Sequence, residues 1–182
     1  MSVAGGYPIP RHLSEVLRRN PAKSGDTRLV GDVVCACGSR SFAVLYVGYP
    51  GVRDYGSRTP VLQTTEFGGR YFFRIAARCD GCAKEHLLFD MHLHGWNGFL
   101  CGEEADRKAR PPAYAKWRCD CGGASHRIEI DILAEDKQIS VEESGGELTD
   151  DSWFEGFAWL TLSTVCDACK LERHALVDYE TM

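Results

Sequence analysis

Eight of the nine cysteines in this 182-residue chain fall into two copies of one pattern. In the first copy, Cys35-Ala36-Cys37-Gly38 is followed 41 residues later by Cys79-Asp80-Gly81-Cys82. In the second copy, Cys119-Asp120-Cys121-Gly122 is followed 44 residues later by Cys166-Asp167-Ala168-Cys169. The chain therefore reads as a tandem pair of C-x-C-G…C-x-x-C units, each able to bring four thiolates to one point.

Four converging thiolates suit a closed tetrahedral metal site, most often zinc, because Zn²⁺ accepts soft sulfur ligands and needs no redox chemistry. Iron in a rubredoxin-type site would use the same four sulfurs, so the spacing leaves iron as an alternative. We predict two zinc ions per chain. The predicted ligands are Cys35, Cys37, Cys79 and Cys82 for one ion, and Cys119, Cys121, Cys166 and Cys169 for the other.

A disulfide framework is the competing interpretation of so many cysteines. The segment 1–8 has neither the basic region nor the apolar core of a secretory signal. We therefore expect a cytoplasmic protein, and in a reducing compartment this spacing favours metal binding over disulfides. Cys101 belongs to neither copy and is interpreted as a free thiol, because no activating pair lies near it in the sequence.

The repeat extends beyond the cysteines to the apolar segments around them. Three strand-like segments recur in the same order relative to the two cysteine turns, and one of them, around Ile128, Ile130 and Ile132, alternates cleanly with charged residues. The matched segments are 42–47 with 128–132, 71–77 with 157–162, and 85–90 with 173–178. Internal repetition of this kind predicts two units of the same structure.

These two cysteine turns at the ends of strands resemble the zinc-ribbon group of the rubredoxin-like folds. The resemblance covers residues 33–90 and 117–178 and is one of pattern. It departs from the common ribbon in the C-x-C spacing of each first turn and in the long intervals between turns. It implies a three-stranded antiparallel ribbon per repeat, and it implies a module that binds protein or nucleic acid more often than an enzyme.

We therefore predict a mainly β protein made of two tandem zinc-ribbon-like antiparallel units with a short N-terminal helix. The helix is expected at Arg11–Asn20, where Leu13, Val16 and Leu17 share one face and Pro21 follows. Residues 48–69, rich in glycine, are expected to be loops. The predicted division is an arm with the helix over 1–30, a first repeat over 31–100, a linker over 101–115 and a second repeat over 116–182.

Four histidines near the first and second repeats are further candidates for chemistry. His92 and His94 are two residues apart, so on a strand they would share a face, where a second metal or a proton transfer is conceivable. The alternative is that both imidazoles simply line one face of the strand. His86 and His174 follow a cysteine turn and are expected to be hydrogen-bond donors beside the ligands or surface residues, because each site already has four sulfurs.

Charge is distributed unevenly along the chain. Residues 1–105 hold 12 Lys/Arg and 10 Asp/Glu, whereas residues 106–182 hold 9 and 16, and the whole chain has a net charge of −5. The excess lies between strands of the second repeat, in a segment that is interpreted either as a solvated insert or as a docking face for a basic partner. Its acids are Glu135, Asp136, Glu142, Glu143, Glu147, Asp150, Asp151 and Glu155, opposed by Lys137.

The function that these observations favour is binding of another protein by a non-catalytic zinc protein, since no phosphate loop, metalloprotease or hydrolase motif is present. No stretch reaches the roughly 18 apolar residues of a membrane helix. The alternatives are a small inhibitor or immunity-type protein and a nucleic-acid-binding ribbon. The latter is disfavoured by acidity but draws on a row of arginines. That row is Arg70, Arg74 and Arg78, and it would be strengthened by continuity with Arg40, Arg53 and Arg58. The sequence predicts no oligomeric state.

Overall fold

A computed structural model describes residues 6–54 and 58–182, and it confirms a mainly β protein with antiparallel sheets and only short helices. The strands are β1 Leu17–Arg19, β2 Arg28–Val33, β3 Phe42–Val47, β4 Tyr49–Asp54, β5 Arg58–Gln63, β6 Thr65–Phe67, β7 Arg70–Phe72, β8 Arg74–Cys79, β9 Glu85–Asp90, β10 Ala115–Lys116, β11 His126–Leu133, β12 Trp159–Cys166 and β13 Glu172–Glu180. The helical segments are 3₁₀ turns at Arg11–Leu13 and Trp153–Glu155, a π-helical turn at Asn97–Cys101, and the α-helices α1 Glu104–Arg107 and α2 Lys137–Glu143.

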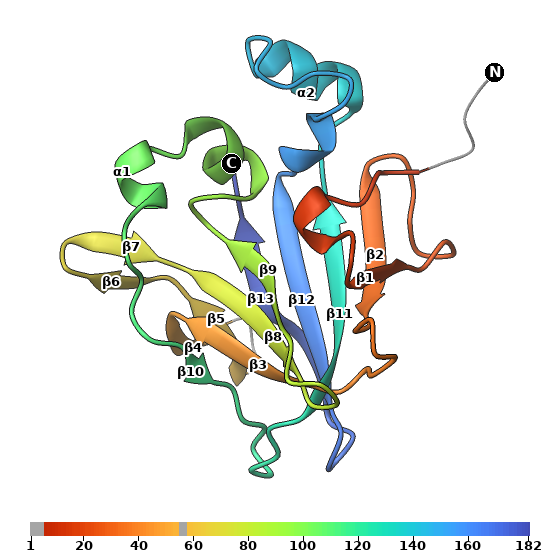
Figure 1. Cartoon of the computed structure of the whole chain (residues 1–182), viewed down its shortest axis with the longest axis vertical. Helices are drawn as coiled ribbons and strands as arrows, with labels where there is room; N and C mark the ends of the chain where they lie inside the picture. The colour runs from red at the N-terminus through yellow and green to blue at the C-terminus, as the bar shows by residue number, and fades with distance from the viewer. Residues whose placement is uncertain (1–5, 55–57) are drawn as a thin grey trace.

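The main sheet contains both repeats. Strands β3, β8 and β9 pair antiparallel as one three-stranded unit, and β11, β12 and β13 pair antiparallel as a second. The units meet where Phe42 of β3 pairs with His126 of β11. In the view of Figure 1 the strands of the two units cross, and the cysteine turns gather toward the lower end.

Strands β2 and β10 link the two units, because each pairs with a strand of the other unit. Strand β2, which precedes the first cysteine pair, pairs with β11 of the second unit, with Asp32 opposite Glu129. Strand β10, which precedes the third cysteine pair, pairs with β3 of the first unit, with Lys116 opposite Leu45. Each unit therefore receives a strand from the segment that leads into the other. The division of the chain into independent domains stays a prediction.

The core lies between the two crossing groups of strands. On β11 and β12 the residues alternate between buried and more exposed, as expected when one face of a strand packs and the other meets water. All six residues of strand β3 are buried. The largest fully buried side chains are Tyr7, Phe42, Phe73, Phe89, Phe157, Leu13, Leu17, Leu29, Ile75, Leu88, Ile130 and Ile132.

The N-terminal helix predicted over 11–20 is wrong beyond its first turn. The helical part is a 3₁₀ turn at Arg11–Leu13, and Leu17–Arg19 forms β1, which pairs with β2. The apolar residues that suggested a helical face are buried as expected, but the edge of β2 offered hydrogen bonds that the sequence could not reveal. The first five residues of the predicted arm lie outside the described residues.

The predicted loop over 48–69 is also wrong, because it contains two hairpins. Strand β4 pairs with β5, and β6 pairs with β7 around the two-residue turn Gly68-Gly69. Both glycines have positive φ, +60° and +75°, which is the geometry of a tight hairpin turn. The glycines thus mark turns between strands rather than an irregular loop. Tyr55-Gly56, part of the same prediction, lies outside the described residues.

The segment between the repeats contains α1 and β10 as well as irregular backbone. The acidic segment of the second repeat, residues 134–155, which we call the acidic insert, contains α2 and a 3₁₀ turn and lies at the opposite end of the molecule from the cysteine turns (Figure 1). Among residues 6–54 and 58–182, no helix is both long enough and apolar enough to cross a membrane.

Candidate metal centres

The first four cysteines form one compact group, which we call site 1. Cys35 and Cys37 lie in the turn after β2, Cys79 ends β8, and Cys82 lies in the turn before β9. The sulfur atoms of Cys35 and Cys82 are 3.5 Å apart, as are those of Cys37 and Cys79, and all four lie within 4.8 Å of one another.

The last four cysteines form the equivalent group, site 2. Cys119 and Cys121 lie in the turn before β11, Cys166 ends β12, and Cys169 lies in the turn before β13. The sulfurs of Cys119 and Cys169 are 3.6 Å apart and those of Cys121 and Cys166 are 3.7 Å apart. The sequence repeat therefore predicted the grouping of the sulfurs correctly.

The size of both groups fits a tetrahedral thiolate site. Four sulfurs at the usual zinc–sulfur distance of about 2.3 Å would be about 3.8 Å apart. The close pairs, at 3.5 to 3.7 Å, approach that edge length. Because every donor is a sulfur and each group has four of them, such a site is closed, with no position for water or substrate.

Burial alternates within each site. In site 1, Cys35 and Cys79 are buried while Cys37 and Cys82 are exposed, and site 2 repeats this pattern. Each group therefore has two cysteines at the edge of the core and two that are exposed to solvent. An ion held there would crosslink two turns that are distant in sequence.

The backbone of the two sites repeats as closely as the sulfurs do. The glycines after each first cysteine pair, Gly38 and Gly122, have φ of +87° and +84°, a conformation that favours glycine. Their N–H groups donate to the carbonyl oxygens of Cys35 and Cys119, at 2.8 Å in both cases.

Two other glycines, which the sequence analysis did not single out, face the sulfurs directly. The N–H of Gly81 donates to the sulfur of Cys79 at 3.3 Å, and that of Gly123 donates to the sulfur of Cys121 at 3.4 Å. A methyl group on Gly123 would lie 2.8 Å from the sulfur of Cys166, which is too close. The available signal in the sequence was that each lies two residues after a cysteine.

Hydrogen bonds to sulfur prepare one thiolate in each site. Burial raises the pKa of Cys79, but the N–H groups of Cys82 and Gly81 that point at its sulfur hold the pKa below its ordinary value. The N–H of Cys169 has the same effect on the pKa of Cys166, against the opposing effect of burial. A thiolate is the form that binds a metal, so these hydrogen bonds favour the metal-binding form at one sulfur of each site.

The histidines beside the sites differ between the copies. His86 is 8% exposed, and its Nε2 lies 3.4 Å from the sulfur of Cys35. It therefore lies beside a predicted ligand, which was one of the two positions expected for it. In the second copy the strand register places Arg173, not His174, at the matching position, because Ala77 pairs with His86 and Thr164 with Arg173. His174 is on the surface, with its side chain 82% exposed.

His92 and His94 do not converge on a metal. They lie in a turn after β9 rather than on a strand. His92 Nε2 is 2.9 Å from the carbonyl oxygen of Tyr71, whereas His94 Nδ1 accepts a hydrogen bond from the N–H of Asp90 and its ring stacks on His12, 3.6 Å between centroids. Within the described residues, no group of three or more His, Cys, Asp or Glu side chains suited to a metal includes them. Cys101 is exposed in the π-helical turn and lies in neither site.

Among the acids of the acidic insert, one residue is buried and the others are exposed. Glu155 is buried, 6% exposed, and accepts a hydrogen bond from the N–H of Arg11 at 3.1 Å. Burial raises the pKa of Glu155 against the lowering effect of Arg11. The expectation that Glu155 belongs to a solvated segment is therefore wrong, while the other seven acids of the insert are exposed.

Of the three arginines predicted to share a strand, only Arg74 and Arg78 do so, on β8, whereas Arg70 lies on β7. Arg70 pairs with Asp106 and Arg74 with the buried Asp90, while Arg78 is exposed. Arg40 contacts Asp32 at 3.8 Å. The side chains of Arg53 and Arg58 lie outside the described part of the structure.

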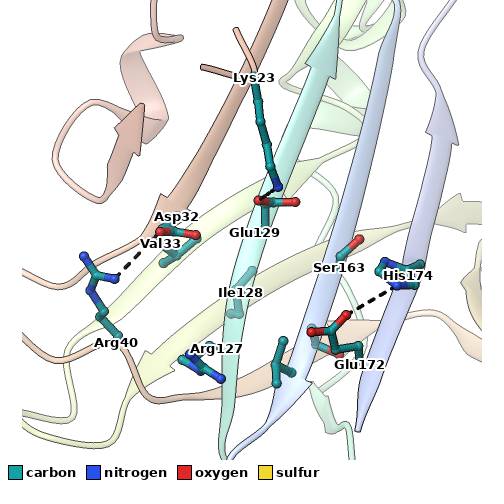
Figure 2. Close-up of a pocket in the computed structure, with 12 residues that line it drawn as sticks. Lys23, Asp32, Val33, Arg40, Arg127, Ile128, Glu129, Ser163, Glu172 and His174 are labelled. Atoms are coloured by element: carbon teal, nitrogen blue, oxygen red, sulfur yellow. Dashed lines mark hydrogen bonds and ion pairs between the residues drawn. The ribbon is translucent and has the colours of Figure 1, made fainter. Parts of the chain in front are cut away.

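A groove of about 230 Å³ crosses the open face of β2, β11, β12 and β13 (Figure 2). Charged side chains line it in pairs, such as Lys23 with Glu129 at 2.7 Å and Arg40 with Asp32 at 3.8 Å. Because the charges neutralise one another locally, the groove selects for neither an anion nor a cation.

Comparisons of the chain with protein-family models, with curated proteins and with solved structures found no match, so function is inferred from the sites themselves.

Proposed function

We propose that this chain is a non-catalytic zinc protein that binds another protein. Sites 1 and 2 each bind one zinc ion through their four cysteines, and the ions stabilise the fold. The acidic insert is the docking surface, and its partner carries a basic face. The proposal places the protein in a reducing compartment such as the cytoplasm, where thiols persist.

The closed donor sets support a structural role for the metal. Zinc that activates water keeps an open position, whereas four thiolates complete a tetrahedron. Zinc binding by such sites is worth roughly 10–16 kcal/mol in small peptides, enough to order turns that have little core of their own. The proposed role of zinc is therefore to hold the ends of β8 and β12 to the turns after β2 and before β11.

The observation that carries the binding role is the charge of the acidic insert. It holds eight acids and one lysine, and Lys137 pairs with Asp150 at 3.0 Å. The carboxylates of Glu135, Glu143 and Glu147 are exposed and have no ion-pair partner within residues 6–54 and 58–182. Ile139, 42% exposed on α2, adds an apolar contact among these charges. A surface of this kind steers and holds a basic protein.

Nucleic acid is the weaker alternative. Phosphate binding needs clustered, unpaired Lys and Arg. Here many arginines contact carboxylates of the same chain, including Arg28 with Asp131 at 2.6 Å and Arg173 with Asp120. This internal pairing favours a protein partner.

Metal analysis tests the first part of the proposal. Protein purified without added metal is expected to contain two zinc ions per chain. Iron in place of zinc would overturn the choice of metal. A content near zero or one ion would overturn the paired sites.

Capture from native lysate tests the second part. The test variant reverses four charges of the insert, E142K/E143K/D150K/D151K, and a matched control reverses four exposed acids elsewhere, D26K/E66K/E103K/E104K. Wild type and control are expected to retain the same protein partner and the insert variant to lose it. Equal retention by all three would overturn the docking surface. Retention of nucleic acid by all three, weakening steeply with salt, would favour the alternative.

A further inference from the structure

The two metal centres contact each other through equivalent residues. Ser41 and Ser125 each lie six positions after the first cysteine of their site, and Asp80 and Asp167 each directly follow the third cysteine. Each serine of one copy meets the aspartate of the other. These four residues, which we call the bridge, belong to the turns that present the sulfurs.

Each side of the bridge consists of two hydrogen bonds. The hydroxyl of Ser41 donates to the carboxylate of Asp167, and the N–H of Asp80 donates to the carbonyl oxygen of Ser41 at 3.0 Å. The hydroxyl of Ser125 donates to the carboxylate of Asp80, and the N–H of Asp167 donates to the carbonyl oxygen of Ser125 at 2.9 Å. Hydrogen bonds that end on a carboxylate are about twice as strong as neutral ones.

This reciprocity is the mark of a two-fold relation. In a two-fold interface, if residue i of one unit contacts residue j of the other, then j of the first contacts i of the second. The serine–aspartate contacts obey this rule, and Phe42 and His126, equivalent residues seven positions after the first cysteine, pair with each other. The pairing of β2 with β11 and of β10 with β3 obeys it as well.

We infer that sites 1 and 2 bind metal cooperatively, because each cysteine turn is held in place by the turn of the other site. Metal binding at site 1 orders the turn that carries Asp80, and Asp80 then positions Ser125 next to the first cysteine pair of site 2. Binding of the first ion includes the loss of conformational entropy that orders both turns. The second ion binds to turns that are already ordered and therefore binds more tightly, which is positive coupling without a change of fold. This inference rests on the proposed metal binding, but not on the proposed protein partner.

Removal of one ligand from one site tests the coupling. Reduced, metal-free protein is titrated with Co²⁺, whose absorption reports thiolate coordination, as wild type and as Cys37→Ser and Cys121→Ser. Each variant is expected to bind Co²⁺ at its intact site roughly 5- to 150-fold more weakly than wild type does. Because linkage is reciprocal, the loss should be the same factor in both variants. An intact site that binds as tightly as in wild type would overturn the inference.

A second variant leaves all eight ligands in place, so it remains decisive if a cysteine variant fails to fold. In S41A/S125A, both bridge hydroxyls are absent. We expect two ions to bind with the cooperativity reduced, so that a chelator removes them in two separate phases rather than in the single phase expected of wild type. Ser14→Ala, which removes an exposed hydroxyl that bonds the carbonyl of Arg11, is the control and should behave as wild type.

Two independent, equal sites in wild type and in S41A/S125A would overturn the coupling while leaving the zinc scaffold and its protein partner intact. If no protein partner is found but metal binding is cooperative, the proposed docking surface is overturned and the coupling of the two sites is retained.

Discussion

At the scale of single residues, each site has one glycine close to its sulfurs, Gly81 in site 1 and Gly123 in site 2. At Gly123 the sulfurs lie too near the backbone for a side chain. A methyl group on Gly123 would be 2.8 Å from the sulfur of Cys166 and 3.2 Å from that of Cys121. The same group on Gly81 would be 3.4 Å from the sulfur of Cys37, so Gly123 has less room for a side chain than Gly81 has.

Gly123→Ala should therefore weaken metal binding at site 2. The added methyl must displace a sulfur from the tetrahedron, and disturbances next to ligands usually cost about 10- to 100-fold in metal affinity. Competition with a chelator measures this. Gly25→Ala is the control, because no atom lies within 4 Å of its new methyl group, and it should leave affinity unchanged. An unchanged affinity in Gly123→Ala would contradict the packing described here.

The stacked pair His12–His94 makes stability depend on pH. Burial lowers the pKa of His12 to about 3, assisted by His94, and lowers the pKa of His94 to about 4, assisted by Arg74. Both values lie below the ordinary 6.5, so below pH 6.5 the unfolded chain takes up protons that the folded protein does not. The two histidines therefore have no effect of this kind well above pH 6.5, and below it each lowers the free energy of unfolding by up to about 1.4 kcal/mol per pH unit as the pH decreases toward 4.

His12→Gln removes one of these groups while keeping a donor for the carbonyl of Leu88, which His12 Nε2 contacts at 3.2 Å. Urea unfolding at pH 7 and pH 5 with zinc present is expected to show a smaller loss of stability in this variant than in wild type. His174→Gln, at an exposed position, should retain the wild-type dependence. Equal pH dependence in all three proteins would show that the pKa of His12 is the same in the folded and the unfolded protein.

At the scale of elements, short segments are stabilised by caps and by neighbouring strands more than by their own length. Helix α2 has seven residues, too few to be stable alone. Its N-cap is Asp136, whose carboxylate accepts a hydrogen bond from the N–H of Gln138 at 2.8 Å. The exposed docking surface that we propose therefore depends on one cap.

Asp136→Ala should destabilise α2 by about 1 kcal/mol, the usual cost of losing an N-cap. Hydrogen exchange of the α2 amides is expected to accelerate, with the strands of the sheet unaffected. Asp151→Ala, which removes an exposed acid outside the helix, serves as the charge-matched control. Acceleration of equal size in both variants would assign the effect to charge rather than to capping.

At the scale of the whole molecule, the two repeats share strands. Residues 1–108 contain β2, whose partner is β11, and residues 109–182 contain β10, whose partner is β3. The two segments also share the bridge between the sites. Because each repeat alone would have a small core, we expect such sharing to make the two repeats unfold as one cooperative unit.

Neither half is therefore expected to fold by itself as a monomer. Expressed alone, 1–108 and 109–182 should each lack a cooperative unfolding transition, whereas coexpressed they should form a 1:1 complex. Size-exclusion chromatography with metal analysis measures both. Two halves that each unfold cooperatively as monomers would instead support independent domains with a boundary in the predicted linker.

The sequence by itself determined the sulfur groups, the mainly β fold and the strands that flank the cysteines. Cysteine spacing and strand alternation are local, so they can be read from a single chain, as with Cys35 and Cys37 or Ile128 and Ile130. Tertiary structure decided what depends on partners distant in sequence. The edge of β2 made a strand of Leu17–Arg19, burial removed Glu155 from the solvated insert, and carboxylates from other segments engaged Arg70 and Arg74. The same holds for the bridge, since nothing near Ser41 in sequence indicates that its partner is Asp167. A hydrogen bond between surfaces that meet only after folding leaves no periodic signal in the chain.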